Sequence, residues 1–260
     1  MDISVFVPGH ITGFFNIENN VNPLKNGSCG AGFLVNRGVL TDISSSDTLE
    51  IEVNQGDYTV INEVLKILNI EKPVKITQDI QLPIGAGFGT SASSALGLAI
   101  GLNEFFNLGY NLEKCGQIAH RAEINLGSGL GDVIAQMGRG VVLRTKAGAP
   151  GIGEIKSFVN EKLVVATKTF GEIDTASIIQ DPDYKKIISG NAIEEYGPEA
   201  TEPSDEETIS EVIKTDYGYF FRLENNGHGF NPAYRLELSN PETLIAVDTA
   251  DPYSMDGYSS

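Results

Sequence analysis

Apolar residues recur along the first 170 positions of the chain with the two periods typical of helices and of strands. Residues 57–70 place Val60, Val64, Leu65 and Leu68 on one helical face, and residues 91–108 and 111–125 also look helical. Strands are expected in the shorter alternating or apolar segments 3–7, 49–54, 72–83, 139–146 and 161–169. Mixed helices and strands of this kind predict an α+β fold.

The composition changes towards the C-terminus. Residues 197–210 are acidic and contain prolines, which predicts a linker or surface loop. Beyond them, residues 220–226 and 233–240 look more like strands than helices, and residues 217–260 show no helical periodicity. We therefore expect an N-terminal domain over residues 1–155 and a C-terminal domain over 156–260, divergent after about residue 190.

Composition and charge exclude several classes of protein. Hydrophobic content of 41% and charged content of 20% describe an ordinary soluble globular protein, and no apolar run approaches the roughly 18 residues that span a membrane. The first residues lack the regions of a signal peptide, so a cytoplasmic protein is expected. Cys29 and Cys115 are too few for a disulfide framework or a zinc site and are expected as reduced thiols. A net charge of −17 argues against binding nucleic acid.

Residues 83–92, PIGAGFGTSA, crowd three glycines against the start of an expected helix. Glycine allows a ligand to approach the backbone closely, and a helix N-terminus offers unpaired N–H groups, so the segment predicts an anion site, most often one for phosphate. A Walker A loop would need a lysine, and none lies between Lys75 and Lys114. A dinucleotide fingerprint needs an acid at the end of the next strand, about 20 residues on, whereas Glu104 falls inside the following helix.

The same ten residues resemble the signature P-x-x-x-G-[LF]-G-[ST]-S-A of the GHMP kinases. The resemblance implies that this loop wraps the phosphates of ATP and that Ser91 helps to hold Mg²⁺. The residues matched to nucleotide binding are Pro83, Gly85, Gly87, Phe88, Gly89, Thr90, Ser91 and Ala92. The alternatives are a tight turn without a ligand, or Thr90 or Ser91 acting only as an N-cap.

A phosphotransferase also needs a carboxylate for the metal and a group that positions or deprotonates the attacking hydroxyl. The segment HRAEINLGSGLGD, residues 120–132, supplies Glu123 on an expected helix and Asp132 after a glycine-rich loop. Their offset resembles the Glu…S-G-x-D arrangement of GHMP kinases. By that match Glu123 coordinates Mg²⁺ and Asp132 is the catalytic base. Read singly, Glu123 could lie on a solvated helix face and Asp132 in a turn.

The first family motif, at residues 7–15, has His10 where many members carry lysine or arginine. Together with segments 27–39, 143–151 and 170–179, it resembles the archaeal members of the family that phosphorylate the 4-hydroxyl of (R)-pantoate on a route to coenzyme A. This resemblance runs from residue 1 to about 190. The residues that it matches to substrate binding are His10, Ser28, His120, Arg144 and Thr175.

Each of these matches has an alternative. A buried arginine recognises a carboxylate through paired hydrogen bonds, which suits Arg144, but an arginine can also snorkel from an edge strand. His120 could be a satisfied core histidine, and Ser28 and Thr175 could be turn or cap residues.

The resemblance implies a GHMP kinase-like fold, with an N-terminal lobe of the ribosomal protein S5 domain 2-like type and an atypical C-terminal region. It implies ATP and Mg²⁺ as cofactors, pantoate as substrate, no nucleic-acid or membrane partner, and a homodimer. Two rival hypotheses remain, namely a homoserine or mevalonate type of GHMP kinase and a catalytically inactive nucleotide-binding protein.

Overall fold

The structure is a computed structural model, and it describes residues 2–158, 165–168, 211–215, 218–222 and 245–248 of the chain. These residues belong to two compact units. The first contains all elements from β1 to β6, and the second contains the short strands β7 to β10. The predicted division between residues 155 and 156 falls inside β6, which ends at Phe158.

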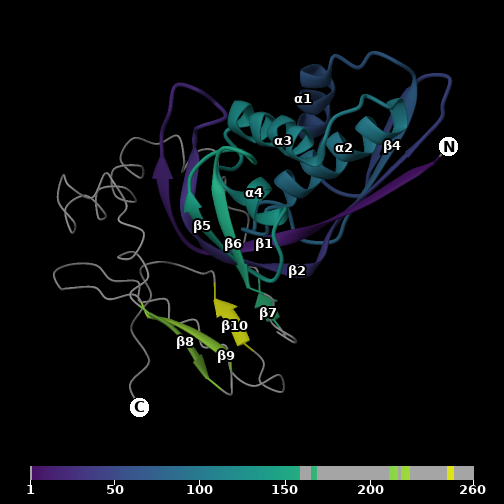
Figure 1. Ribbon diagram of the computed structural model, residues 1–260. Coiled ribbons are helices and arrows are strands. Elements are labelled where there is room, and N and C mark those ends of the chain that lie inside the picture. The colour runs from purple at the N-terminus through teal and green to yellow at the C-terminus, as the bar shows by residue number, and fades with distance from the viewer. Residues whose placement is uncertain (1, 159–164, 169–210, 216–217, 223–244, 249–260) are drawn as a thin grey trace. The chain divides into compact units, whose positions relative to one another are not determined.

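The first unit contains both strands and helices (Figure 1). In chain order they are β1 (Ile3–Glu18), β2 (Gly27–Ser44), β3 (Leu49–Val53), α1 (Thr59–Leu68), β4 (Val74–Ile80), α2 (Thr90–Phe106), α3 (Leu112–Leu126), α4 (Asp132–Gln136), β5 (Val141–Lys146) and β6 (Glu154–Phe158). The three longer helices and strands β3, β4 and β5 are where the apolar patterns predict them.

Strand β2 is the central strand of a six-stranded sheet. It pairs antiparallel with β1 along most of its length, with β4 through residues 39–44 and with β5 through residues 30–33. Strands β3 and β4 are parallel and are connected through α1, and β6 pairs with β5. Strand β2 thus lies between β1, near the start of the chain, and β5, near residue 145, in the sheet.

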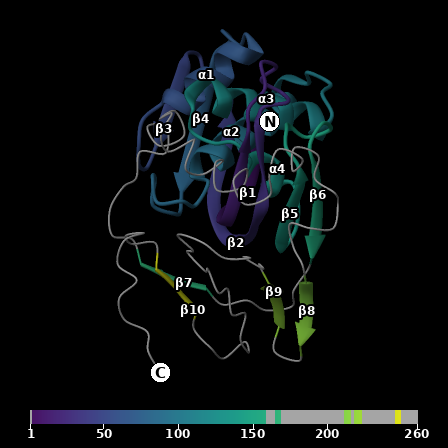
Figure 2. The ribbon, with the colours of Figure 1, turned by 90° about the vertical axis from the view of Figure 1, so that its left-hand side faces the viewer.

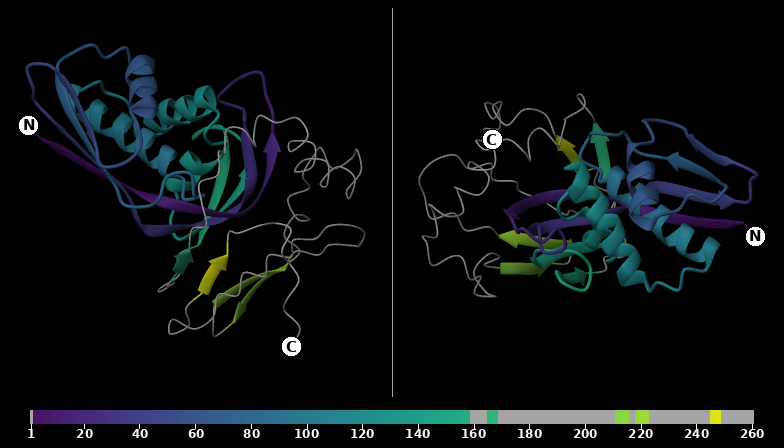
Figure 3. Two further views of the ribbon diagram at one scale, coloured as in Figure 1. Left: turned by 180° about the vertical axis from the view of Figure 1, so that it is seen from behind. Right: turned by 90° about the horizontal axis from the view of Figure 1, so that it is seen from above.

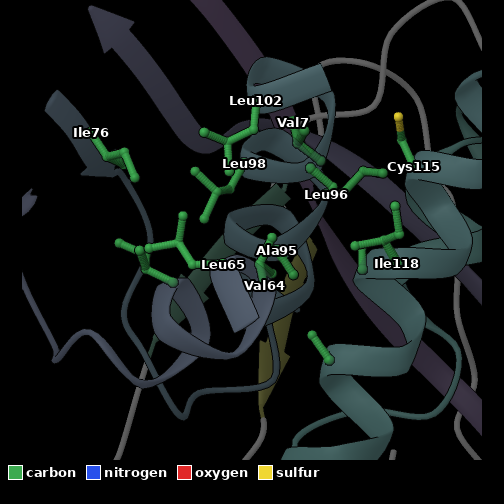
Figure 4. Packing of buried hydrophobic residues seen from close by; sticks show 14 of the residues in the cluster. Val7, Val64, Leu65, Ile76, Ala95, Leu96, Leu98, Leu102, Cys115 and Ile118 are labelled. Carbon is green, nitrogen blue, oxygen red and sulfur yellow. The ribbon is translucent and has the colours of Figure 1, made fainter. Parts of the chain in front are cut away.

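The hydrophobic core lies between the sheet and helices α1, α2 and α3, which Figures 1, 2 and 3 show together on one face of the sheet. Helix α2 is buried over most of its length and packs between the sheet and the other two helices. Figure 4 shows Leu96, Leu98 and Leu102 of α2 among apolar side chains of β1, β4, α1 and α3. This packing fixes α2, so its N-terminus is held in a defined place.

Four features of the first unit differ from the sequence prediction. Strand β1 extends to Glu18 rather than ending at residue 7, because two register shifts, between Pro8 and His10 and between Thr12 and Phe14, let it continue past the proline. The sequence pattern does not predict strand β2, because glycines interrupt its apolar residues, and it does not predict β6 or α4, which are only five residues long. The two cysteines are free thiols, as expected.

The second unit contributes two short strand pairs. Strand β7 (Val165–Lys168) pairs parallel with β10 (Ile245–Asp248), and β8 (Glu211–Thr215) pairs antiparallel with β9 (Gly218–Arg222). Strands β7 and β9 overlap the predicted segments 161–169 and 220–226. The predicted linker at 197–210 and the predicted strand at 233–240 lie outside the described residues. Among the helices that the structure describes, none has the length and apolar character to cross a bilayer.

Candidate active site

The glycine loop connects β4 to the N-terminus of α2. Gly85, Gly87 and Gly89 all have positive φ angles, of 70°, 76° and 61°, which glycine adopts without strain. Gly89 is itself the N-cap of α2, and no side chain caps the helix. The N-cap alternative for Thr90 and Ser91 is therefore wrong, and the first N–H groups of α2 are available for an anion.

Glu123 of α3 lies beside this helix N-terminus. Its carboxylate is 2% exposed and accepts hydrogen bonds from the hydroxyls of Ser91 and Ser128, with Ser128 Oγ at 2.7 Å. Burial raises the pKa of Glu123 to about 7; the two hydroxyls lower it and the nearby charge of Asp132 raises it further. Among the described residues no cation pairs with this buried carboxylate, and a bound metal ion would compensate its charge.

Asp132 begins α4 and contacts a different partner. His10 of β1, whose side chain is fully buried, places Nδ1 2.7 Å from Asp132 Oδ1, and Thr12 Oγ1 lies 3.4 Å from the same nitrogen. Burial alone would raise the pKa of Asp132, but the hydrogen bond and charge of His10 bring it below the usual value. Asp132 is therefore ionised at neutral pH, as a general base must be.

The two carboxylates converge on Gly129. A Cβ atom built at Gly129 would overlap Glu123 Oε2 and lie 3.4 Å from Asp132 Oδ2. The described residues contain no cluster of three or more His, Cys, Asp or Glu side chains that could cage a metal. Two carboxylates and the Ser91 hydroxyl nevertheless suit Mg²⁺, which prefers oxygen ligands and is usually bound by one or two carboxylates together with substrate phosphates and water.

Arg144 of β5 lies near Asp132, whose charge it feels. It is 2% exposed, and its Nε and Nη1 atoms have no hydrogen-bond partner among the described residues. A Cβ atom at Gly131 would stand 2.5 Å from Ser28 Oγ and 2.7 Å from Arg144 Nε. Ser28 and Arg144 therefore both lie against Gly131, the residue that precedes Asp132. Burial lowers the pKa of Arg144 and the charge of Asp132 opposes that shift. A snorkelling arginine is therefore excluded, because the guanidinium is buried with unused donors.

The other residues matched to substrate binding have different surroundings. His120 Nε2 lies 2.9 Å from Asn26 O and 3.2 Å from Pro23 O, so the ring ties α3 to the loop between β1 and β2. Burial lowers the pKa of His120, which favours the neutral ring. His10 forms a side-chain contact with Asp132. Thr175 lies outside the described residues.

Sequence reasoning missed four polar residues that touch this site. Ser128 donates to Glu123, and Thr12 lies beside His10. Gln136 and Ser93 both contact the carbonyl oxygen of Gly89. Ser128 stands within the glycine-rich loop already singled out, and Gln136 follows Asp132 by one helical turn, but nothing local to Thr12 or Ser93 distinguishes them.

The chain is similar to known kinases both in sequence and in fold. The family model of the GHMP kinase N-terminal domain matches residues 58–140, which include the glycine loop, Glu123 and Asp132. A pantoate kinase of Methanocaldococcus jannaschii is 35% identical over 81% of this chain and 73% of its own length. One of Thermococcus kodakarensis is 34% identical over 72% of this chain and 66% of its own length.

A solved structure described as a phosphotransferase related to the CoA biosynthesis pathway has a TM-score of 0.57 and 28% identity, covering 75% of both chains. The fold is thus a GHMP kinase fold, as expected. The relatives show that the chain belongs to the GHMP kinase family, in the branch that contains the pantoate kinases. The chain spans between about two thirds and three quarters of the length of these relatives, 66% and 73% in the two cases.

Proposed function

We propose that the protein transfers the γ-phosphoryl group of ATP to the 4-hydroxyl of (R)-pantoate, giving ADP and 4-phosphopantoate for coenzyme A biosynthesis. The observation that carries this proposal is Arg144, a buried cation with unpaired donors next to an ionised carboxylate. Pantoate presents a carboxylate and a hydroxyl, which match the cation and the base respectively. The names of the relatives support the same substrate, and the structural neighbour is described as a phosphotransferase related to CoA biosynthesis.

Each group in the site then has a role. The backbone N–H groups at the start of α2 hold the phosphates of ATP, and Asp132 accepts the proton of the 4-hydroxyl as its oxygen attacks phosphorus. Glu123 and Ser91 would hold Mg²⁺, which when bound supplies positive charge to the phosphate oxygens. Arg144 binds the pantoate carboxylate, and Ser28 beside it donates a hydrogen bond to the same anion. His120 and Thr175 remain candidate substrate contacts.

A coupled ADP-release assay with pantoate, homoserine, mevalonate and shikimate tests the proposal. We expect Mg²⁺-dependent turnover with pantoate, and background rates with the other acceptors. Turnover with homoserine or mevalonate instead would assign the chain to another type of GHMP kinase. ATP binding by calorimetry without ADP release from any acceptor would identify an inactive nucleotide-binding protein.

Substitution of Arg144 tests the carboxylate site directly. Leaving a buried charged partner unpaired costs roughly 2–5 kcal/mol, so Arg144→Ala should raise KM for pantoate by about 10- to 1000-fold and leave KM for ATP nearly unchanged. Arg144→Lys should recover only part of the loss, because an ammonium lacks the planar fork of the guanidinium.

Arg139→Ala is the matched control, since Arg139 is an exposed arginine just before the same strand. Unchanged kinetics in Arg144→Ala would remove the carboxylate assignment. Equal increases in both KM values would indicate damage to the fold.

The homodimer implied by the family resemblance is part of the proposal. Light scattering coupled to gel filtration should give twice the chain mass of 27.9 kDa. A mass equal to one chain would contradict it.

A further inference from the structure

Gln136 connects the helix that carries Asp132 to the glycine loop. It lies one turn after Asp132 on α4 and is 5% exposed. Its Nε2 donates to Gly89 O and to Ser93 Oγ, both at 2.9 Å, while its Oε1 has no partner among the described residues. A Cβ atom at Gly89 would stand 3.0 Å from Gln136 Nε2 and 3.2 Å from Asp132 Cβ, so α4 packs closely against the loop at this residue.

The carbonyl groups of Phe88 and Gly89, the last two of the loop, both accept hydrogen bonds from other parts of the first unit. Phe88 O accepts from the backbone N–H of His10 at 2.9 Å. Gly89 O accepts three hydrogen bonds, from Gln136 Nε2, from Ser93 Oγ at 3.1 Å and from the backbone N–H of Ser93 at 3.0 Å, so Gln136 adds a tertiary contact to the first backbone hydrogen bond of α2. In a trans peptide the carbonyl and the following N–H point in opposite directions. Holding these two carbonyls therefore directs the N–H groups of Gly89 and Thr90 away from their anchors, towards the side where an anion can bind.

We propose that Gln136 is a positioning residue for phosphoryl transfer, which sets the orientation of the phosphate-binding N–H groups and their distance from Asp132. The inference rests on the proposed function, since it takes the loop as the phosphate site and Asp132 as the base. One amide thereby joins the two parts that must be aligned in the reaction, the donor phosphate and the group that receives the proton. Gln136 itself touches no reacting atom.

The chain contains a matched control for this role. Gln78 of β4 is also a buried glutamine that bonds to α2, with Nε2 3.1 Å from Ser94 O and 2.9 Å from Thr41 Oγ1. Its contacts lie further along α2 and do not include the loop. The serines form a second pair, because Ser93 contacts Gly89 and Gln136 whereas the adjacent Ser94 donates to Gln78 at 2.6 Å.

The experiment compares Gln136→Met with Gln78→Met, which remove one buried amide each at nearly constant volume. Calorimetry with ATP and Mg²⁺, without acceptor, gives Kd, and steady-state assays give kcat and both KM values. For Gln136→Met we expect Kd for ATP to rise and kcat to fall by up to about 10-fold each, in the range for the loss of one buried hydrogen bond. KM for pantoate should change less than about 3-fold. Gln78→Met should lower Tm and leave these constants near wild type.

Ser93→Ala and Ser94→Ala repeat the comparison with smaller changes, should either methionine variant fail to fold. Ser93→Ala should weaken ATP binding and Ser94→Ala should not. Equal Tm losses with unchanged ATP affinity in both glutamine variants, or in both serine variants, would overturn the proposal. If the wild-type protein bound ATP but did not phosphorylate pantoate, only the assignment of pantoate as substrate would be refuted. If ATP binding still depended on Gln136, its role in setting the loop would stand.

Discussion

The pKa values of two carboxylates in one site are shifted in opposite directions by their immediate neighbours. Glu123 is buried among hydroxyls, and its pKa is raised to about 7, whereas His10 holds the pKa of Asp132 below its usual value. Such separation of two acids is how one site obtains different roles from the same chemical group. Asp132 is ready to accept a proton, and Glu123 becomes fully charged when a cation compensates it.

Asp132→Asn tests the base. The amide keeps the size of the side chain but cannot accept the proton, so kcat should fall by about 100-fold or more, while Kd for ATP stays within about 3-fold of wild type (a change well under 1.4 kcal/mol). Asp42→Asn, at an exposed position of β2, is the control. Wild-type turnover in Asp132→Asn would assign the base elsewhere.

Glu123→Gln tests the cost of burying a charge in the metal-free protein. The pKa of Glu123 is raised from 4.5 to about 7 in the folded state, so the folded state binds the proton more tightly and stability is lost as pH rises between these values. The full shift corresponds to about 3 kcal/mol above pH 7.

In the presence of a chelator, Glu123→Gln should therefore raise Tm at pH 8 but leave it nearly unchanged at pH 4.5. Glu113→Gln, on the exposed face of the same helix, should change Tm little at either pH. A Glu123→Gln protein less stable than wild type at pH 8 would show that the carboxylate is compensated without metal.

At the scale of elements, the sequence pattern predicts those helices and motifs that depend on residues close together in the chain. Helices α1, α2 and α3 have long apolar faces, and the glycine loop, Glu123 and Asp132 follow from motif spacing. Glycines interrupt the apolar residues of strand β2, and α4 is too short to show a period. The pairing of His10 with Asp132 joins residues 122 positions apart, and the Gln136 contact with Gly89 spans 47. No local pattern encodes contacts of that range, because they depend on how β1 and α4 pack around α2.

A pair of glycine substitutions tests the loop as an element. Gly87 and Gly89 both have positive φ, so alanine at either position costs about 1–2 kcal/mol of stability. A Cβ atom at Gly87 meets nothing within 4 Å, whereas one at Gly89 presses on Gln136 and Asp132. Gly89→Ala should therefore weaken ATP binding by about 10-fold more than Gly87→Ala. Equal affinities in calorimetry would show that the contact between the loop and α4 does not affect the nucleotide.

At the scale of the whole molecule, the negative net charge of the protein opposes the binding of anions at the site. The chain carries a net charge of −17, and both ATP and pantoate are anions. The long-range field therefore repels such anions, and under the proposed function backbone N–H groups together with the buried Arg144 attract them only at short range. Buried groups are screened less by salt than surface charges are.

Ionic strength should thus affect this enzyme in an unusual direction. Raising the salt from about 10 mM to about 150 mM shortens the screening length from about 30 Å to about 8 Å, which suppresses the repulsion but leaves the buried contacts nearly intact. With saturating Mg²⁺, kcat/KM for pantoate should rise several-fold over this range, while kcat at saturating substrates stays constant. The measurement is a series of progress curves at constant pH in a monovalent salt. A steady fall of kcat/KM from the lowest salt would show that the local cations, rather than the acidic surface, govern how substrates approach the site.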